Sequence, residues 1–380
     1  MFAVGLATPI VPLYASSLGA SWTQIGLLGT SWGVTLMLLG MITGRLSDRY
    51  GRKPLLVASG VLSVVAAFLY LLSSNVLEVI LIRILEAAAW ALFWPTVEAL
   101  ATEIVEPRVA GRAMGMATAS YGIAFATSSL AGGYITGATG YSGTFTVYVA
   151  LAVISTLAAI FLLRGPRPQR PATVARRTHI RPDQASLRSP TVLLAYFLGG
   201  TYTFGYGTVI TLVSVFAKNL SVTVFLIGAL FGCFWLGRIV GSFIGGRFSD
   251  KYGREPVIVV AMGSSALGFM LVALSSGIEL LFGGIIILGF SIGAIFPAVV
   301  ALISDNIHQS VRGYAMGTFE AACAAGFMLA ATVGGLVSDL YSPRAPYVLA
   351  ALVSLASLIP LVIKRARSVA AGSEVVRVVG

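Results

Sequence analysis

An apolar run between residues 76 and 101 carries charged and aromatic side chains on one helical face. At about 100° per residue, a stripe roughly a third of the circumference wide holds Arg83, Glu86, Ala87, Trp90, Trp94 and Glu98. Arg83 and Glu86 are three residues apart, so they can neutralise each other as a structural ion pair. A paired carboxylate beside a cavity can also exchange its proton as the pair breaks. We therefore expect Glu86 to handle protons or substrate, and Glu98 to support the structure.

Two further charges lie in apolar runs, Arg238 between residues 224 and 245 and Glu320 between residues 315 and 337. A charge at the centre of a bilayer costs at least about 2.5 kcal/mol, so such side chains should face the protein interior or a wet cavity. Arg238 and Glu320 can form a mutual ion pair, or they can bind substrate and protons. The sequence leaves both alternatives open.

Aromatic side chains in several apolar runs could line the same cavity. They are Tyr14, Trp32, Trp90, Trp94, Tyr202 and Tyr206. Tryptophan and tyrosine also gather at membrane interfaces, and for the three tyrosines that position is the alternative. Trp90 lies on the charged stripe, so we expect it to face the cavity.

The composition indicates what must position these residues. Of 380 residues, 57% are hydrophobic and only 10% are charged, which exceeds what a soluble core of this size requires. A helix needs about 20 apolar residues to cross a bilayer, and the short alternating segments of a membrane barrel are absent from the sequence. Twelve apolar runs fit helical crossings: 2–18, 24–43, 55–72, 76–101, 113–136, 144–163, 192–216, 224–245, 257–274, 280–304, 315–337 and 347–363. The prediction is an all-α integral membrane protein.

The second half of the chain repeats the first at an offset of 202 residues. GRLSDRYGRKPL (Gly44–Leu55) reappears as GRFSDKYGREPV (Gly246–Val257), and Gly133 matches Gly335 at the same offset. The sequence thus predicts two pseudo-symmetric six-helix bundles, at 1–165 and 191–366, with a basic linker at 166–190 and a tail at 367–380. Arg238 and Glu320 break the repeat, because their equivalents are Leu36 and Thr118, and this asymmetry suggests a function.

Each repeated segment should form a tight, charged turn between two spans. Glycine permits the unusual backbone angles of such a turn. The aspartate of the turn, Asp48 in the first copy, can accept hydrogen bonds from arginine and from backbone amides. We predict a conformational latch that holds the halves together when the cavity faces outward. It comprises Gly44, Asp48, Arg49, Gly51, Arg52 and Glu103 in the first half and Gly246, Asp250, Gly253, Arg254 and Asp305 in the second. The alternative is an ordinary membrane-flanking turn.

Positive charge concentrates on the side of the repeated turns. All but four of the 25 Lys and Arg residues fall there, the exceptions being Arg83, Lys218, Arg238 and Arg344. The positive-inside rule places that face and both termini in the cytoplasm, so the chain should be a multi-pass protein of the plasma membrane. An Arg-rich linker that lies beside anionic lipid accounts for the net charge of +11, so we expect no nucleic-acid partner. The first run has no basic flank, so we interpret it as a retained span and not as a secretory signal.

The two turn segments resemble the signature loop of the major facilitator superfamily, between spans 2 and 3 and again between spans 8 and 9. The resemblance covers the whole chain through the repeat, the twelve spans and the long central loop. It implies two bundles that rock about a central site near the bilayer midplane, exposing it to each side in turn. Pro9 and Pro12 (TPIVP) and Arg83 are similar to features of the drug and proton antiporters. SSLAGG (Ser128–Gly133) lacks the Gly-Pro pair of that branch, which leaves symport and uniport open.

Three functions therefore compete. The first is proton-coupled efflux of small amphipathic compounds, with Glu86 and Glu320 as proton carriers. The second is uptake of a sugar, organic acid or other polar metabolite, with Arg83 and Arg238 as anion contacts. The third is a non-transporting membrane receptor. The first two require a small-molecule substrate, with protons as the expected coupling ion, and a single chain should suffice.

Enzymatic and metal chemistry finds no support in the sequence. Cys233 and Cys323 lie within spans and indicate neither a disulfide framework nor a metal site. His179 and His308 lie in predicted cytoplasmic loops, which excludes a histidine relay at the bilayer midplane. No glycine loop with a lysine is present to cradle phosphates. We expect no cofactor, no metal and no catalytic residues.

Overall fold

The computed structural model describes residues 1–103, 110–163, 187, 189–308, 311–361 and 363, and the regular elements of that part are all helices. The side chains of residues 41, 44, 45, 48, 102, 103 and 110–114 lie outside the description. In the first half, the helices are α1 (Phe2–Ala7), α2 (Ile10–Ser17), α3 (Trp22–Tyr50), α4 (Arg52–Leu72), α5 (Val76–Glu103) and α6 (Ala110–Phe161). In the second half, they are α8 (Pro190–Asn219), α9 (Val224–Tyr252), α10 (Arg254–Leu274), α11 (Ile278–Asp305), α12 (Arg312–Leu340) and α13 (Ala345–Ala356).

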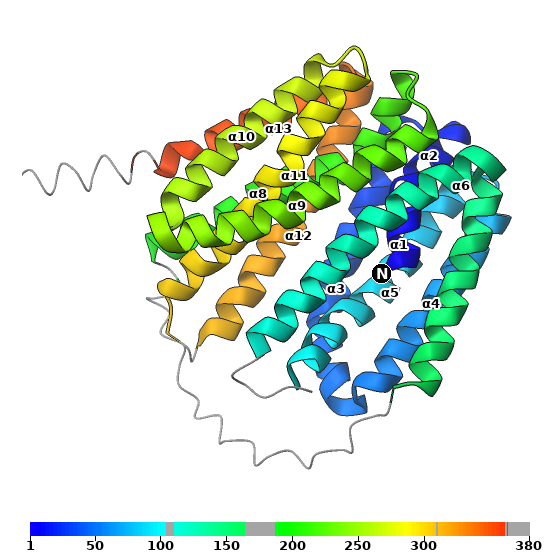
Figure 1. Cartoon of the computed structure of the whole chain (residues 1–380), viewed down its shortest axis with the longest axis horizontal. Coiled ribbons are helices and arrows are strands. Elements are labelled where there is room, and N and C mark those ends of the chain that lie inside the picture. The colour runs from blue at the N-terminus through cyan, green and yellow to red at the C-terminus, as the bar shows by residue number, and fades with distance from the viewer. Residues whose placement is uncertain (104–109, 164–186, 188, 309–310, 362, 364–380) are drawn as a thin grey trace, which may run out of the picture.

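The helices form two groups that lie side by side, one from each half of the chain (Figure 1). By length and composition, six of the described helices could cross a membrane, namely α4, α6, α9, α10, α11 and α12. Helices α3, α5 and α8 have 29, 28 and 30 residues, enough for a crossing of about 20 residues. The predicted all-helical fold of two pseudo-symmetric bundles is confirmed. The predicted linker and tail fall almost wholly outside the described residues, so the domain boundaries stay predictions.

Three crossings differ in detail from simple rods. The first consists of α1 and α2, which break at Thr8 and Pro9, where a proline ring cannot donate to the helix ladder. The fifth and sixth runs are continuous in α6 except at Gly140, whose φ of 75° lies in the region that favours glycine. One residue therefore makes the reversal that the sequence placed in a loop of several residues.

The repeated segments have the same backbone in both halves. Helix α3 ends before Gly51, with φ 88°, and α9 ends before Gly253, with φ 93°. The Gly51 amide donates to the Ser47 carbonyl at 3.0 Å, and the Gly253 amide donates to the Ser249 carbonyl at 3.1 Å. A side chain would be strained at either glycine, which explains why the tight turn predicted from the spacing needs this residue.

The halves meet chiefly through two helix pairs, α3 with α12 and α6 with α9. A Cβ on Gly26 would lie 3.1 Å from the Gly335 Cα, and a Cβ on Gly228 would lie 2.8 Å from the Gly133 Cα. At the offset of 202, Gly228 is the equivalent of Gly26, and Gly335 is the equivalent of Gly133. The same backbone contact therefore occurs twice, as two pseudo-symmetric halves require, and small residues permit it.

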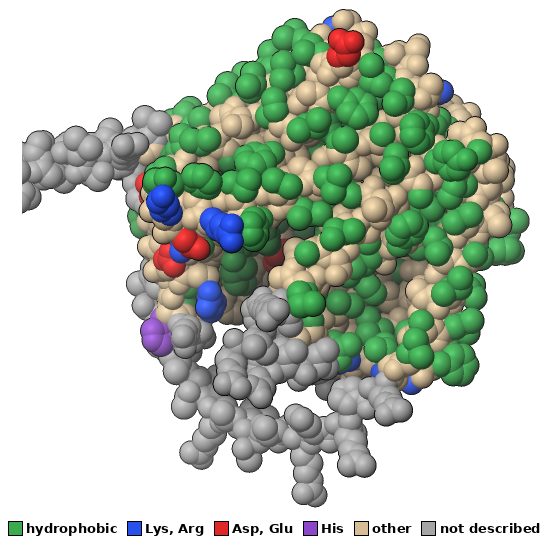
Figure 2. Space-filling view, viewed as in Figure 1, with side chains coloured by type: hydrophobic (Ala, Val, Ile, Leu, Met, Phe, Trp, Pro, Cys, Tyr) green, Lys and Arg blue, Asp and Glu red, His purple; other side chains and the backbone are tan. Residues whose placement is uncertain are grey.

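These pairs separate along their length. Near the other ends of the same four helices, a Cβ on Gly40, Gly115, Gly246 or Gly317 would meet nothing within 4 Å. We call the end that carries the Gly51 and Gly253 turns the motif face, and the other end the closed face. Figure 2 shows a hollow that opens between the halves, with acidic atoms visible inside it and basic side chains at its rim. The space between the halves is thus open toward the motif face.

Replacing Gly26 by valine should destabilise the contact between the halves. The new Cβ would lie 2.3 Å from the Ala331 carbonyl oxygen, and overpacking typically costs about 1–3 kcal/mol. We expect a lower melting temperature of the detergent-purified protein, whereas Gly40→Val, which meets open space, should leave it unchanged. Equal melting temperatures for the two variants would contradict the contact.

Candidate functional site

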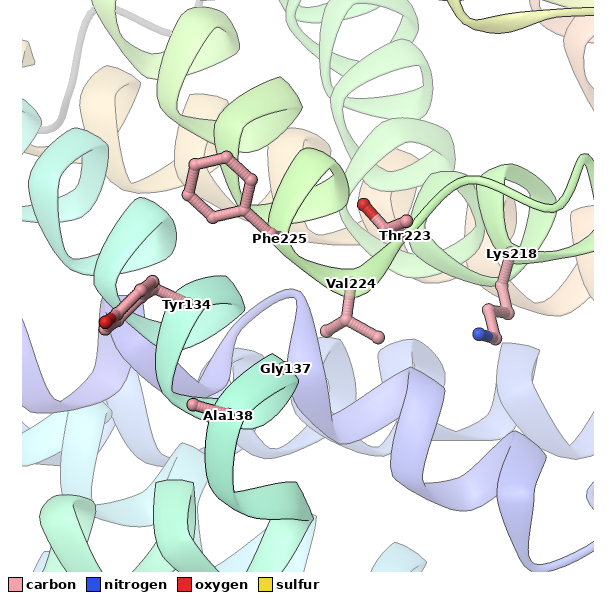
Figure 3. Close-up of a pocket in the computed structure, with 7 residues that line it drawn as sticks. All are labelled: Tyr134, Gly137, Ala138, Lys218, Thr223, Val224 and Phe225. Carbon is pink, nitrogen blue, oxygen red and sulfur yellow. The ribbon is translucent and has the colours of Figure 1, made fainter.

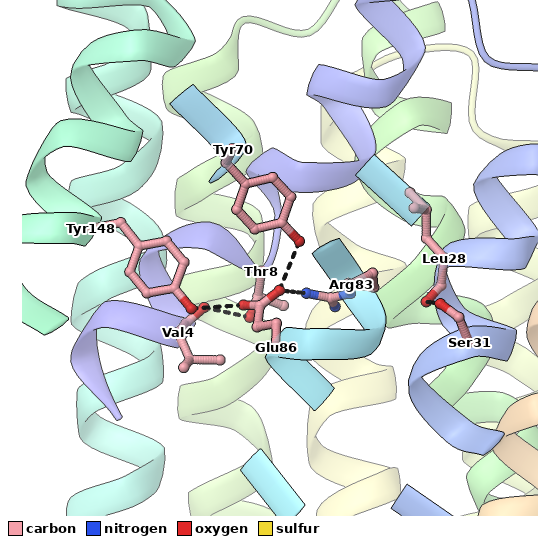
Figure 4. Close-up of polar contacts among 8 residues, drawn as sticks. All are labelled: Val4, Thr8, Leu28, Ser31, Tyr70, Arg83, Glu86 and Tyr148. Atoms are coloured by element: carbon pink, nitrogen blue, oxygen red, sulfur yellow. Dashed lines mark hydrogen bonds and ion pairs between the residues drawn. The ribbon is translucent and has the colours of Figure 1, made fainter. Parts of the chain in front are cut away.

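Glu86 is held inside the first half by three donors. Arg83 Nη1 lies 2.7 Å from Glu86 Oε2, the Tyr70 hydroxyl donates to the same oxygen at 2.9 Å, and the Tyr148 hydroxyl donates to Oε1 at 3.0 Å. Figure 4 shows the two tyrosines converging on the carboxylate from α4 and α6. The exposed fraction of Glu86 is 1% and that of Arg83 is 7%. In this conformation the geometry favours the structural alternative for the Arg83–Glu86 pair, and proton transfer through Glu86 stays a prediction.

Arg83, on α5, also contacts an aromatic ring of α3. Its guanidinium lies over the Trp32 ring, 4.3 Å from the centroid. Its Nε atom is buried and has no hydrogen-bond partner among the described residues. Arg83 is therefore neutralised by Glu86 and retains one donor that no described residue uses.

Aromatic side chains link the two halves in an unbroken series. Trp32 lies 6.4 Å from Trp90, Trp90 lies 5.8 Å from Tyr121, and Tyr121 lies 5.2 Å from Trp235, all between ring centroids. Trp94 stacks on Trp90 at 6.0 Å with an interplanar angle of 2°. Because Trp235 belongs to α9 and the others belong to the first half, this series crosses the gap between the bundles. We call Trp32, Trp90, Trp94, Tyr121 and Trp235 the aromatic bridge.

Arg238 lies midway along α9, at the far end of the aromatic bridge. Its Nη2 donates to the Tyr202 hydroxyl at 3.1 Å, and its guanidinium lies 4.6 Å from the Tyr206 centroid and 5.1 Å from that of Trp235. In the part of the chain that the structure describes, no carboxylate is paired with Arg238. The mutual ion pair with Glu320 that the sequence left open is absent there.

Glu320, on α12, faces the space between the halves. It is accessible to water, and it has no hydrogen bond or ion pair to another described residue. Its charge interacts with Glu98 of α5 across the gap and with Tyr202 of α8. Tyr202 thus interacts with both Arg238 and Glu320, which form no described ion pair with each other.

Tyr14 is not brought to the aromatic bridge. Its hydroxyl donates to the Ser73 carbonyl at 2.5 Å, and its ring packs against Tyr141 and Phe145 inside the first half. These contacts fit the alternative position at a membrane interface. A role in the cavity wall stays a prediction.

The predicted latch is visible only in the second half. Arg254 Nε lies 3.0 Å from Asp305 Oδ2, and the Arg254 guanidinium also pairs with Asp250. These residues come from α9, α10 and α11, so the described contacts stay within one bundle. The side chains of Asp48 and Glu103 lie outside the description, as does that of residue 44.

The other members of the latch make local contacts. Arg52, at the start of α4, donates to the Ser47 hydroxyl of α3. The Arg49 guanidinium lies 5.4 Å from the centroid of the neighbouring Tyr50 ring. A Cβ on Gly246 would meet nothing within 4 Å. Whether the latch joins the halves in an outward-facing state stays a prediction.

Asp339 at the end of α12 caps the first turn of α3, a contact that the sequence analysis missed. Its Oδ1 accepts from the Trp22 amide at 3.0 Å, and its Oδ2 accepts from the Thr23 amide at 2.7 Å and from the Thr23 hydroxyl at 2.6 Å. Partial burial opposes ionisation, but these hydrogen bonds outweigh it and lower the pKa of Asp339 below its usual value. The cap joins the two halves at the closed face.

The equivalent of Asp339 in the first half is Gly137, which has no side chain to offer. Beside it, at the start of α9, lies a surface pocket (Figure 3). Its lining consists of Tyr134, Gly137, Ala138, Lys218, Thr223, Val224 and Phe225. The two helix pairs are therefore closed by the same glycine contacts, but only α3 receives a carboxylate from the other half.

Two matches to a model of the Major Facilitator Superfamily cover residues 1–217 and 192–376. The chain belongs to the major facilitator superfamily. Among solved structures, a variant of the nucleoside transporter NupG superposes with a TM-score of 0.79 at 14% identity, covering 95% of this chain and 96% of that one. Members of the superfamily are integral, multi-pass membrane transporters of small molecules and not enzymes.

Two curated relatives match over most of their length. The uncharacterised major facilitator transporter YceJ of Bacillus subtilis is 26% identical over 344 residues, 89% of this chain and 87% of YceJ. The multidrug resistance protein MdtG of Klebsiella pneumoniae is 26% identical over 392 residues, 98% of this chain and 92% of MdtG. The major facilitator resemblance inferred from the turn segments is confirmed.

Removing the Asp339 carboxylate should loosen the closed face. Loss of a helix cap costs about 1 kcal/mol, which corresponds to about a fivefold change in an equilibrium constant. In a background without Cys233 and Cys323, we expect Asp339→Ala to raise the labelling rate of Thr332→Cys by a membrane-impermeant maleimide several-fold. Because the pKa of Asp339 is lowered, the cap is complete above its unfolded-state pKa and is lost as pH falls through the folded-state value. Glu279→Ala, which removes an exposed acid at the start of α11, is the control, and equal labelling in both variants would refute the cap.

Glu86→Gln should destabilise the first half. Removing one partner of a buried ion pair typically costs about 3–5 kcal/mol, because the other charge remains buried and unpaired. We expect a markedly lower melting temperature in detergent, and we expect Arg83→Gln combined with Glu86→Gln to recover part of the loss. A single variant as stable as the wild type would show that Glu86 is not held as an ionised partner.

Proposed function

We propose that this transporter exports amphipathic compounds across the cytoplasmic membrane in exchange for protons. The observation that carries the proposal is Glu320, an unpaired carboxylate at a water-accessible position between the halves. No described donor holds it in the ionised form, so it is free to take up and release a proton. Glu98 lies within electrostatic range, and a proton on either carboxylate relieves the repulsion between them.

Glu86 is the weaker candidate for proton exchange. It is buried and accepts from three donors, so protonation would require breaking its contacts with Arg83, Tyr70 and Tyr148. Glu320 has none of these constraints. We therefore assign the exchangeable proton to Glu320 and a structural role to Glu86.

The packing of the halves supports alternating access. Helices α3 and α12, and α6 and α9, are in backbone contact near the closed face and apart near the motif face. A rocking motion that closes the motif face and opens the other would expose the site between Arg238 and Glu320 first to one side of the membrane and then to the other. The excess of Lys and Arg on the motif face supports its placement in the cytoplasm, with the hollow open to that side.

The similarity to MdtG over nearly the whole chain supports efflux as the direction of transport. A second candidate is uptake of an anionic metabolite, and one observation favours it. Arg238 has no described carboxylate partner, so its charge is available to an anion. The direction of substrate movement relative to protons distinguishes the two.

Glu320→Gln should abolish the coupling of transport to protons. In proteoliposomes loaded with ethidium as the probe, we expect an imposed proton gradient to accelerate ethidium movement against the proton flow. We expect the variant to lose this acceleration at least tenfold, because glutamine cannot carry a proton. The matched control is Glu279→Gln, an exposed residue of α11 remote from the hollow.

Three results would contradict the proposal. They are proton-driven ethidium movement that survives in Glu320→Gln, movement in the same direction as the protons, and a lack of ethidium movement in the wild type. Circular dichroism and the melting temperature of each variant separate a lost proton site from a lost fold.

A further inference from the structure

Arg238 differs from Arg83 in what neutralises it. Arg83 has Glu86 at 2.7 Å, whereas the described partners of Arg238 are tyrosine hydroxyls and two aromatic faces. Buried charges in proteins are normally paired or hydrogen-bonded, because removing a charge from water is expensive. A tyrosine hydroxyl and π-faces stabilise a cation only in part. The arrangement leaves Arg238 able to accept an anionic partner from outside the chain.

The missing anion is not supplied by Glu320. The two residues lie on different helices, α9 and α12, and Tyr202 of α8 interacts with both. The Tyr202 hydroxyl accepts from Arg238, and Glu98 and Cys323 are the other titratable side chains that interact with Glu320. One cation and one carboxylate thus face the same space without neutralising each other.

The side chains packed beside Arg238 are aromatic. Trp235 packs against both Arg238 and Tyr121, and Tyr121 continues the aromatic bridge to Trp90 and Trp94. Tyr121, Trp90 and Trp94 are only partly buried, so part of their surface remains available for contact. Aromatic faces bind aromatic or flat apolar groups through offset stacking, worth about 0.5–1.5 kcal/mol per pair beyond burial.

We propose that the hollow binds an amphoteric substrate with an aromatic body, whose acidic group contacts Arg238 and whose basic group contacts Glu320. This inference depends on the proposed function in one respect, because the basic group takes the place of the proton on Glu320. Substrate binding then releases a proton and proton binding releases the substrate, as exchange requires. The contact between the substrate's acidic group and Arg238 takes no part in that exchange. It determines which class of substrate binds.

The arrangement also explains why both charges break the repeat. Their equivalents, Leu36 and Thr118, are uncharged, so the first half has no second pair of this kind. A single amphoteric ligand between the halves needs one cation and one carboxylate, and both come from the second half. The first half contributes most of the aromatic wall.

Three naphthyl compounds with the same ring system provide the test. They are 2-naphthylalanine, which carries both charges, 3-(2-naphthyl)propionate, which carries the acid, and 2-(2-naphthyl)ethylamine, which carries the base. Binding to the detergent-purified protein is measured by calorimetry without a proton gradient, so the result does not depend on transport. The variants are Arg238→Gln, Arg238→Lys and Glu320→Gln, with Lys218→Gln as the control for loss of a cation elsewhere.

We expect the wild type to bind naphthylalanine about tenfold more tightly than either singly charged compound. Arg238→Gln should reduce its affinity to that of the amine, and Glu320→Gln should reduce it to that of the acid. Arg238→Lys keeps the charge and should retain part of the affinity. Unchanged binding of the amine by Arg238→Gln shows that its loss of affinity for naphthylalanine is not a loss of fold. Lys218→Gln should bind all three compounds as the wild type does.

Several outcomes would overturn the inference. Tight binding of the amine, with no effect of Arg238→Gln, would make this a site for organic cations. Tight binding of the acid, with no effect of Glu320→Gln, would make it a site for organic anions. Lack of binding by all three at millimolar concentration would also refute it. Charge-dependent binding of naphthylalanine without proton release into weakly buffered solution would support the subsites and contradict the proposed exchange.

Discussion

The cost of a charge inside a membrane governs the arrangement of this protein. Each ionisable group in a span needs an opposite charge, a set of hydrogen bonds or water. Arg83 and Glu86 satisfy the requirement with each other and with two tyrosines, so this site is complete within the first half. Arg238 and Glu320 do not satisfy it together, and both face the space between the halves. The charges left incomplete are therefore the ones on which we propose that a ligand and a proton act.

The internal repeat accounts for the backbone contacts and turns that the two halves share. The contacts of Gly26 with Gly335 and of Gly228 with Gly133 are equivalent at the offset of 202, and so are the turns at Gly51 and Gly253. These features recur because each half must pack and turn in the same way. Arg238 and Glu320 in the hollow and Asp339 at the closed face depart from the repeat, and so do Arg83 and Glu86, whose equivalents are Ile285 and Leu288.

The fold could be predicted from the sequence because it depends on local features. Apolar runs of sufficient length indicate bilayer crossings, and the duplicated turn segment indicates the repeat. The stripe of Arg83, Glu86 and Trp90 was also predictable, since all three lie on one helix at helical spacing. Tyr70 and Tyr148 were not, because they reach Glu86 from helices whose rotation no single-sequence pattern determines. Their one signal was a tyrosine in an apolar run, which needs a partner when buried.

Closure of one face constrains how the transporter can move. Because α3 and α12 meet along only part of their length, closing the motif face must break the glycine contacts and the Asp339 cap at the other end. An equilibrium between two such states responds only to ligands that bind them differently. A ligand held by groups of the second half and an aromatic wall mostly from the first half contacts both moving bodies, so its affinity must change as they rock. Placing the charges on one body and the wall on the other thus couples binding to the motion.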